Sequence, residues 1–79
     1  MPGKIWFLAY SQDKVTRCAY DMRRISEDSN VLAYTDLPRK SSEDPLFVLV
    51  KLKEGDFPSN PKLLELFQKR GVSDPRKVS

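Results

Sequence analysis

The side chains that most often carry acid–base or nucleophilic chemistry are scarce in this chain of 79 residues. It has no histidine, so the most frequent proton shuttle at neutral pH and a common zinc ligand are both missing. Cys18 is the only cysteine, which excludes an intramolecular disulfide and a cysteine metal cluster. Without a histidine to activate its thiol, we expect Cys18 to be a buried core residue. The sequence therefore favours a protein that uses no cofactor and acts by binding rather than by catalysis.

Carboxylates are the remaining candidates for chemistry. The acidic pairs at 27–28 and 43–44 lie in polar segments, and adjacent side chains do not normally converge on one point. Asp13 stands three residues after Tyr10, the last residue of an apolar run. A single carboxylate is a poor metal site, so a second copy of the chain would have to supply another ligand beside Asp13.

Composition and charge indicate one small soluble domain. Hydrophobic residues make up 39% of the chain and charged residues 32%, as in ordinary globular proteins. The longest apolar run, residues 5–10, is too short for a membrane helix or a signal peptide, so we expect a cytoplasmic protein without membrane contact. The formal net charge is +3, and the segment from residue 62 onward carries this whole excess. Such a segment would suit phosphates or an acidic partner.

Three segments have the composition and alternation of β-strands. Residues 4–10 are apolar on both faces, which predicts a central strand, and residues 31–37 predict a second strand. Residues 46–53 predict a third strand whose two faces differ. One face is wholly apolar and holds Leu46, Val48, Val50 and Leu52. The other face begins apolar and ends basic, with Phe47, Leu49, Lys51 and Lys53.

The segment between the first two expected strands has the periodicity of a helix over residues 14–26. Apolar residues recur there at spacings of three and four, which predicts one buried face formed by Val15, Cys18, Met22 and Ile25. Asp21 lies four residues after Arg17, and we expect these two side chains to pair weakly on the solvated face of the helix.

Asn60 followed by Pro61 predicts the start of a second helix, and Gly71 predicts its end in a Schellman-type turn. The resulting order, β-α-β-β-α, resembles most of a ferredoxin-like α+β sandwich. We therefore expect one α+β domain over residues 1–72, with two helices on one face of a three-stranded sheet, and a basic flexible tail over residues 73–79. A fourth strand is not evident and would have to come from the tail or from another chain.

Two helices on one face would leave the opposite face of the sheet bare. The third strand would expose Phe47, Leu49 and Lys51 there. The first strand would add one of its two alternating sets, and the choice is open because both sets are apolar. The interaction face that we predict consists of Trp6, Tyr10, Phe47 and Leu49, with Lys51 and Lys53 at its rim.

The first functional hypothesis is a small interaction or regulatory module that binds a protein partner or itself, as a homodimer, through this sheet face. The alternative is a module that stacks the bases of single-stranded RNA on the same face. The topology resembles that of the RNA-recognition motif, but residues 45–51 contain no glycine and one aromatic residue, unlike the third strand of that motif. Phosphate contacts would then come from Lys51, Lys53, Lys62, Lys69, Arg70, Arg76 and Lys77.

A second alternative is a metal-dependent nuclease. The topology is similar to that of the small CRISPR-associated nucleases of ferredoxin-like fold, which place an aspartate at the end of the first strand of a dimer. The resemblance implies that Asp13 of two copies would hold the metal. Because Asp13 lies three residues beyond the strand, a role in the first helical turn would equally account for it.

Overall fold

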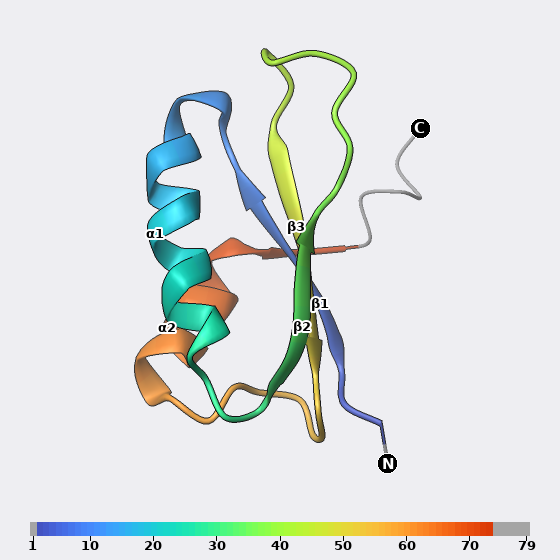
Figure 1. The fold of residues 1–79 in the computed structure, drawn as a ribbon, viewed down its shortest axis with the longest axis vertical. Helices are drawn as coiled ribbons and strands as arrows, with labels where there is room; N and C mark the ends of the chain where they lie inside the picture. Colours follow the sequence, from blue (N-terminus) through green and yellow to red (C-terminus); the bar gives the residue numbers. More distant parts are fainter. Residues whose placement is uncertain (1, 74–79) are drawn as a thin grey trace.

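Two apolar strands form the centre of a four-stranded antiparallel sheet, and two helices cover one of its faces (Figure 1). The computed structural model describes residues 2–73 and has an α+β architecture. The strands stand in the order β2-β3-β1-β4, so that β1 and β3 are central. In chain order the elements are β1 (Ile5–Tyr10), the 3-10 turn η1 (Gln12–Lys14), α1 (Val15–Ser26), β2 (Val31–Asp36), β3 (Leu46–Leu52), α2 (Pro61–Arg70) and β4 (Gly71–Val72).

The core lies between the sheet and the two helices. Strand β3 is buried at every second residue, as its alternation predicts, and Val48 and Val50 are both fully buried. The register of β1 against β3 pairs Leu8 with Val48, so Leu8 projects to the same side and is fully buried as well. Helices α1 and α2 complete this layer, with Ile25 and Phe67 fully buried.

Helix α1 follows the predicted periodicity with two differences. Cys18, Met22 and Ile25 are buried as expected, whereas Val15 in the first turn is 47% exposed. Asp21, which we expected on the solvated face, is only 1% exposed. The expected surface pair with Arg17 is therefore wrong, because the carboxyl of Asp21 lies in the core.

The sheet has a fourth strand that the sequence did not reveal. Strand β4 consists of only two residues and pairs with β1, so that Val72 lies opposite Phe7. The expected three-stranded sheet is thus corrected to four strands, with the fourth supplied by this chain directly after α2. A strand of two residues is too short to produce an alternation that sequence reasoning can detect. Residues 74–79, most of the expected tail, lie outside the described residues.

Gly71 joins α2 to β4, and its conformation differs from the Schellman-type turn that we expected. Its φ of −66° and ψ of 136° are extended rather than left-handed. A glycine is nevertheless required, because a Cβ atom here would lie 2.7 Å from the carbonyl oxygen of Phe67 and 2.9 Å from Cζ3 of Trp6. The residue therefore serves a close approach between α2 and β1.

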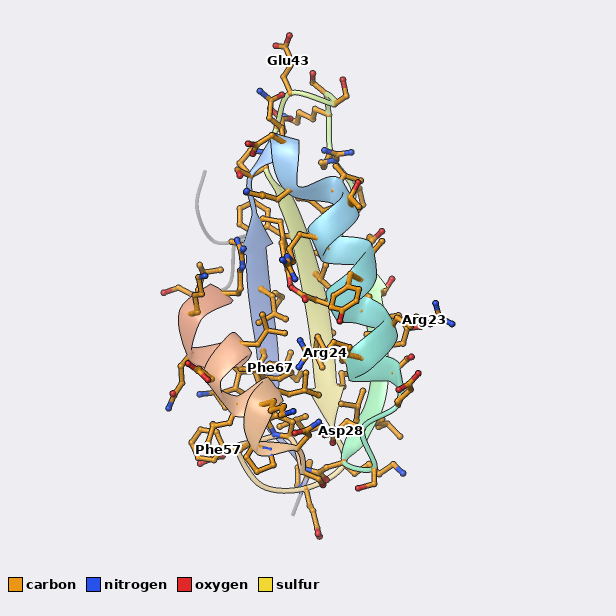
Figure 2. The ribbon with its side chains drawn as sticks, turned by 90° about the vertical axis from the view of Figure 1, so that its left-hand side faces the viewer. Arg23, Arg24, Asp28, Glu43, Phe57 and Phe67 are labelled. Carbon is orange, nitrogen blue, oxygen red and sulfur yellow. The ribbon has the colours of Figure 1, made fainter. Side chains whose placement is uncertain are left out.

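The start of α2 is formed as predicted and is tied to the end of α1. Asn60 caps the helix by accepting a hydrogen bond from the backbone N–H of Lys62. Asp28, which follows α1, accepts three backbone N–H groups, those of Asn30, Ser59 and Asn60, at 2.8–2.9 Å. Figure 2 shows Asp28 between the end of α1 and the start of α2. Partial burial acts to raise the pKa of this carboxyl, but the three donors together hold it below the ordinary value.

Within residues 2–73, neither helix is long and apolar enough to cross a membrane.

We predict that Gly71→Ala lowers the free energy of unfolding by about 1–3 kcal/mol, because the added methyl group must displace either the backbone of α2 or the indole of Trp6. Urea denaturation followed by circular dichroism measures the change. Val72→Ala is the control, since Val72 is 43% exposed and should cost less than about 1 kcal/mol. Equal losses for both variants would contradict the close approach.

We predict that Asp28→Ala lowers the free energy of unfolding at pH 7 by about 1–3 kcal/mol, because three N–H donors lose their acceptor. In the native protein the folded-state pKa of Asp28 is below its unfolded value of about 3.8, so its stabilisation is present above that value and is lost as the pH falls through the folded-state pKa. Denaturation at pH 7 and pH 3 should therefore show a smaller acid-induced loss for the variant. An unchanged difference between the two pH values would disprove the role of this carboxylate.

Candidate functional site

The face of the sheet away from the helices is the first candidate surface, which we call the outer sheet face. Its central rows come from the pairings Ala9 with Phe47, Phe7 with Leu49 and Ile5 with Lys51. The flanking strands extend these rows with Ala33, Thr35 and Val72.

Most of the outer sheet face is apolar, and it is partly accessible. Ile5 is 47% exposed, and Phe47 and Leu49 are half-buried, whereas Phe7 at the centre is buried. Lys51, at the end of the central rows, is exposed and is the one charged residue of these rows. A pocket of about 360 Å³ adjoins Phe47 and is lined by residues of the segment 37–45. The apolar surface therefore continues beyond the start of β3.

Two of the four residues predicted for the interaction face lie on the other side of the sheet. Trp6 and Tyr10 project toward the helices, so they do not join Phe47 and Leu49 in one surface. This corrects the expected set. Both alternating sets of β1 are apolar, so hydrophobicity does not decide which set faces the helices. Trp6 and Tyr10 face them because they contact aromatic and polar side chains of the helices.

Trp6 packs against α2 and the segment that precedes it. Its ring lies 5.4 Å from that of Phe67 and 6.2 Å from that of Phe57, measured between centroids. Its indole N–H donates to the carbonyl oxygen of Asp56 at 2.7 Å, and the ammonium of Lys4 lies 4.1 Å from the ring centroid. These contacts make Trp6 part of the packing of α2 on the sheet.

Tyr10 forms a buried hydrogen bond with Asp21. The phenol donates to Oδ2 of Asp21 at 2.8 Å, and both residues are 1% exposed. Burial, with the hydrogen bond and the nearby carboxyl, holds the pKa of Tyr10 far above its ordinary value, so the phenol stays protonated. From α2, the guanidinium of Arg70 lies 4.6 Å from the centroid of the Tyr10 ring. The pair thus connects β1 with α1, and Arg70 adds a contact from α2.

Cys18 is buried beside this pair, as expected for a core thiol. Burial raises the pKa of its thiol to about 11, with Asp36 and Asp21 adding to the rise and Arg70 opposing it. At neutral pH the thiol is therefore protonated and out of reach of reagents in solution.

The burial of Asp21 leaves the solvent side of α1 cationic, a feature that sequence reasoning missed. Arg17 and Arg24 flank Tyr20, with guanidinium carbons 5.5 and 5.9 Å from the centroid of its ring. Tyr20 is 56% exposed. We call Arg17, Tyr20 and Arg24 the arginine–tyrosine ridge. The available signal was the position of Asp21 one turn before Ile25, on the edge of the apolar stripe.

The basic residues predicted to contact phosphates do not form one surface. Lys51 lies on the outer sheet face, and Lys53 follows the end of β3. Lys62 and Lys69 are exposed on α2, in the helix layer on the other side of the sheet (Figure 1). Arg70 packs against Tyr10, and Arg76 and Lys77 lie outside the described residues.

Asp13 is exposed in η1 and already has a partner. The hydroxyl of Ser11 donates to its Oδ1 at 2.6 Å, and this bond is the main reason that the pKa of Asp13 is lowered. No group of three or more metal-ligating side chains is found in residues 2–73. A metal held by Asp13 of two copies stays a prediction.

We predict that Tyr10→Phe lowers the free energy of unfolding by about 1–3 kcal/mol, because the carboxyl of Asp21 is left buried without its donor. The double variant Tyr10→Phe with Asp21→Leu should lose less than the single variant, since neither partner then leaves a buried polar group unpaired. Urea denaturation of the wild type, both single variants and the double variant gives the coupling. Purely additive losses would mean that the two side chains do not depend on each other.

Comparison with protein-family models, with curated proteins and with solved structures finds no match to this chain.

Proposed function

We propose that the protein is a small binding module that associates with a second copy of itself through the outer sheet face. The observation that carries the proposal is the apolar surface formed by Ile5, Phe47 and Leu49 on the side of the sheet that neither described helix covers. A contiguous apolar surface of this kind on a small domain is typical of an interaction site.

A second copy suits this face for a reason of charge. Lys51 is the one charged residue of the central rows, and it lies two residues beyond Leu49, about 7 Å along the strand. Consider a two-fold axis that lies in the plane between the two sheets, perpendicular to the strands and level with the row of Leu49. It would place the two Lys51 side chains at opposite ends of the interface. The two copies would then bury apolar residues against each other, while the two like charges stay apart in water.

We also propose that the fold is ferredoxin-like. The strand order β2-β3-β1-β4 and the chain order of strands and helices support this. The free thiol of Cys18 supports a reducing compartment such as the cytoplasm. A protein partner with an apolar surface of its own is the nearest alternative occupant of the face.

Base stacking on the outer sheet face has less support. With Trp6 and Tyr10 on the helix side and Phe7 buried, Phe47 is the one aromatic ring of the central rows that a base could reach. The nuclease hypothesis requires a dimer, because each chain would contribute one carboxylate, that of the exposed Asp13, to the metal.

We predict that Phe47→Asp weakens self-association at least about 30-fold, the effect of losing one aromatic anchor worth about 2 kcal/mol. Light scattering over a range of concentrations measures the solution mass. Val15→Asp is the matched control, because Val15 is an exposed apolar residue of the helix layer and should leave the dimer intact. Circular dichroism verifies that both variants are folded.

Two results would overturn the proposal. One is a wild-type protein that stays monomeric at all concentrations, which would leave the face to a different protein. The other is a Phe47→Asp variant that dimerises as well as the wild type, which would move the interface elsewhere.

A further inference from the structure

We propose that the arginine–tyrosine ridge of α1 binds single-stranded nucleic acid, with Tyr20 stacking against a base while Arg17 and Arg24 contact the phosphates on either side. This site lies in the helix layer and does not depend on the self-association proposed above.

The surface charge of α1 favours a negatively charged ligand. The only carboxylate within α1 is that of Asp21, which is buried and bonded to Tyr10. The charges that α1 presents to solvent are therefore all positive, since they belong to its three arginines. A run of positive charge along one helix attracts a polyanion, because binding releases the counterions held by its phosphates.

The spacing of the three side chains along the ridge also favours this ligand. Positions 17, 20 and 24 fall on one stripe of the helix, and the two arginines are two turns apart, about 10 Å along the axis. Tyr20 stands between them with more than half of its surface exposed. Aromatic rings and guanidinium planes are the groups on which unpaired bases stack.

A further cation, Arg70 of α2, lies near α1. Its guanidinium is 4.6 Å from the centroid of the Tyr10 ring, and Tyr10 in turn donates a hydrogen bond to Asp21 of α1. The Nε of Arg70 is buried and has no hydrogen-bond partner among residues 2–73. Figure 2 shows Arg24 on the side of α1 that faces α2. Phosphates bound at the ridge would therefore experience positive charge from both helices.

A single strand fits this site better than a duplex. In a duplex the bases are stacked on one another and are not free to contact Tyr20, whereas the bases of a single strand are accessible. Because the ridge offers a ring face and positive charge, and no set of donors that would read a base edge, we expect binding with little sequence preference.

The test uses the full chain and fluorescein-labelled ten-nucleotide oligomers of uridine and of deoxythymidine, titrated by fluorescence anisotropy at several salt concentrations. Arg17→Gln with Arg24→Gln should weaken binding about tenfold or more and reduce the salt slope by about 1.4, since each lost phosphate contact in a single strand contributes about 0.7. Tyr20→Ala should weaken binding by a similar factor and leave the salt slope unchanged.

Lys40→Gln with Lys53→Gln is the matched control. Both lysines are exposed and lie outside the helices, so this pair removes the same charge without changing any residue of α1. It should change affinity less than threefold. Similar binding of the two oligomers would assign the site to chemistry shared by RNA and DNA, and a strong preference for uridine would assign it to RNA.

Several results would overturn the proposal. They are no binding of either oligomer by the wild type, an equal loss in the control pair, and competition by inorganic polyphosphate as effective as that by unlabelled oligomer. Binding only to vesicles that contain phosphatidylserine would do so as well. Phe47→Asp should retain the affinity per chain, so that a failure of self-association is distinguished from a failure of this site.

Discussion

One buried hydrogen bond, from the phenol of Tyr10 to the carboxyl of Asp21, determines much of what surrounds it. It orients α1 so that its single carboxylate faces inward, which leaves arginines on the solvent side of that helix. It also holds one alternating set of β1 under the helices. The other set, with Ile5 and Phe7, must then face outward together with Phe47 and Leu49 of β3. The apolar character of one side of the molecule and the basic character of the other thus have a common origin.

Patterns with one clear period were sufficient to predict most of the elements. The alternation of β3, the apolar stripe of α1 and the cap at Asn60 are all observed within one or two residues of the expected bounds. The facing of β1 was not predictable, because an alternation of two apolar sets is the same for either choice. Strand β4 was missed because two residues form no pattern. Asp21 was misassigned because its spacing from Arg17 suits a surface pair as well as a buried position beside the apolar stripe.

The candidate site was predictable in part. Phe47, Leu49 and Lys51 share the outer sheet face, as the alternation of β3 requires. Trp6 and Tyr10 lie on the helix side instead. The sequence alone could not assign them to that side, because their partners Phe67 and Asp21 are distant in the chain. The basic residues that we grouped by sequence are divided between the two sides of the sheet. Grouping by charge along the chain cannot reveal this, because strands and helices that follow one another lie in different layers.

The position of Trp6 also determines which structural changes alter the tryptophan fluorescence of this protein. The partly buried indole contacts Phe57, Phe67 and Lys4 and donates to a backbone carbonyl, so its emission depends on how α2 packs on the sheet. It is the only tryptophan of the chain. Its ring lies on the helix side of the sheet, away from the outer sheet face, and it belongs to a different cluster from Tyr20. The emission of Trp6 is therefore a probe of the detachment of α2 during unfolding, and a ligand that leaves α2 in place should leave this emission unchanged.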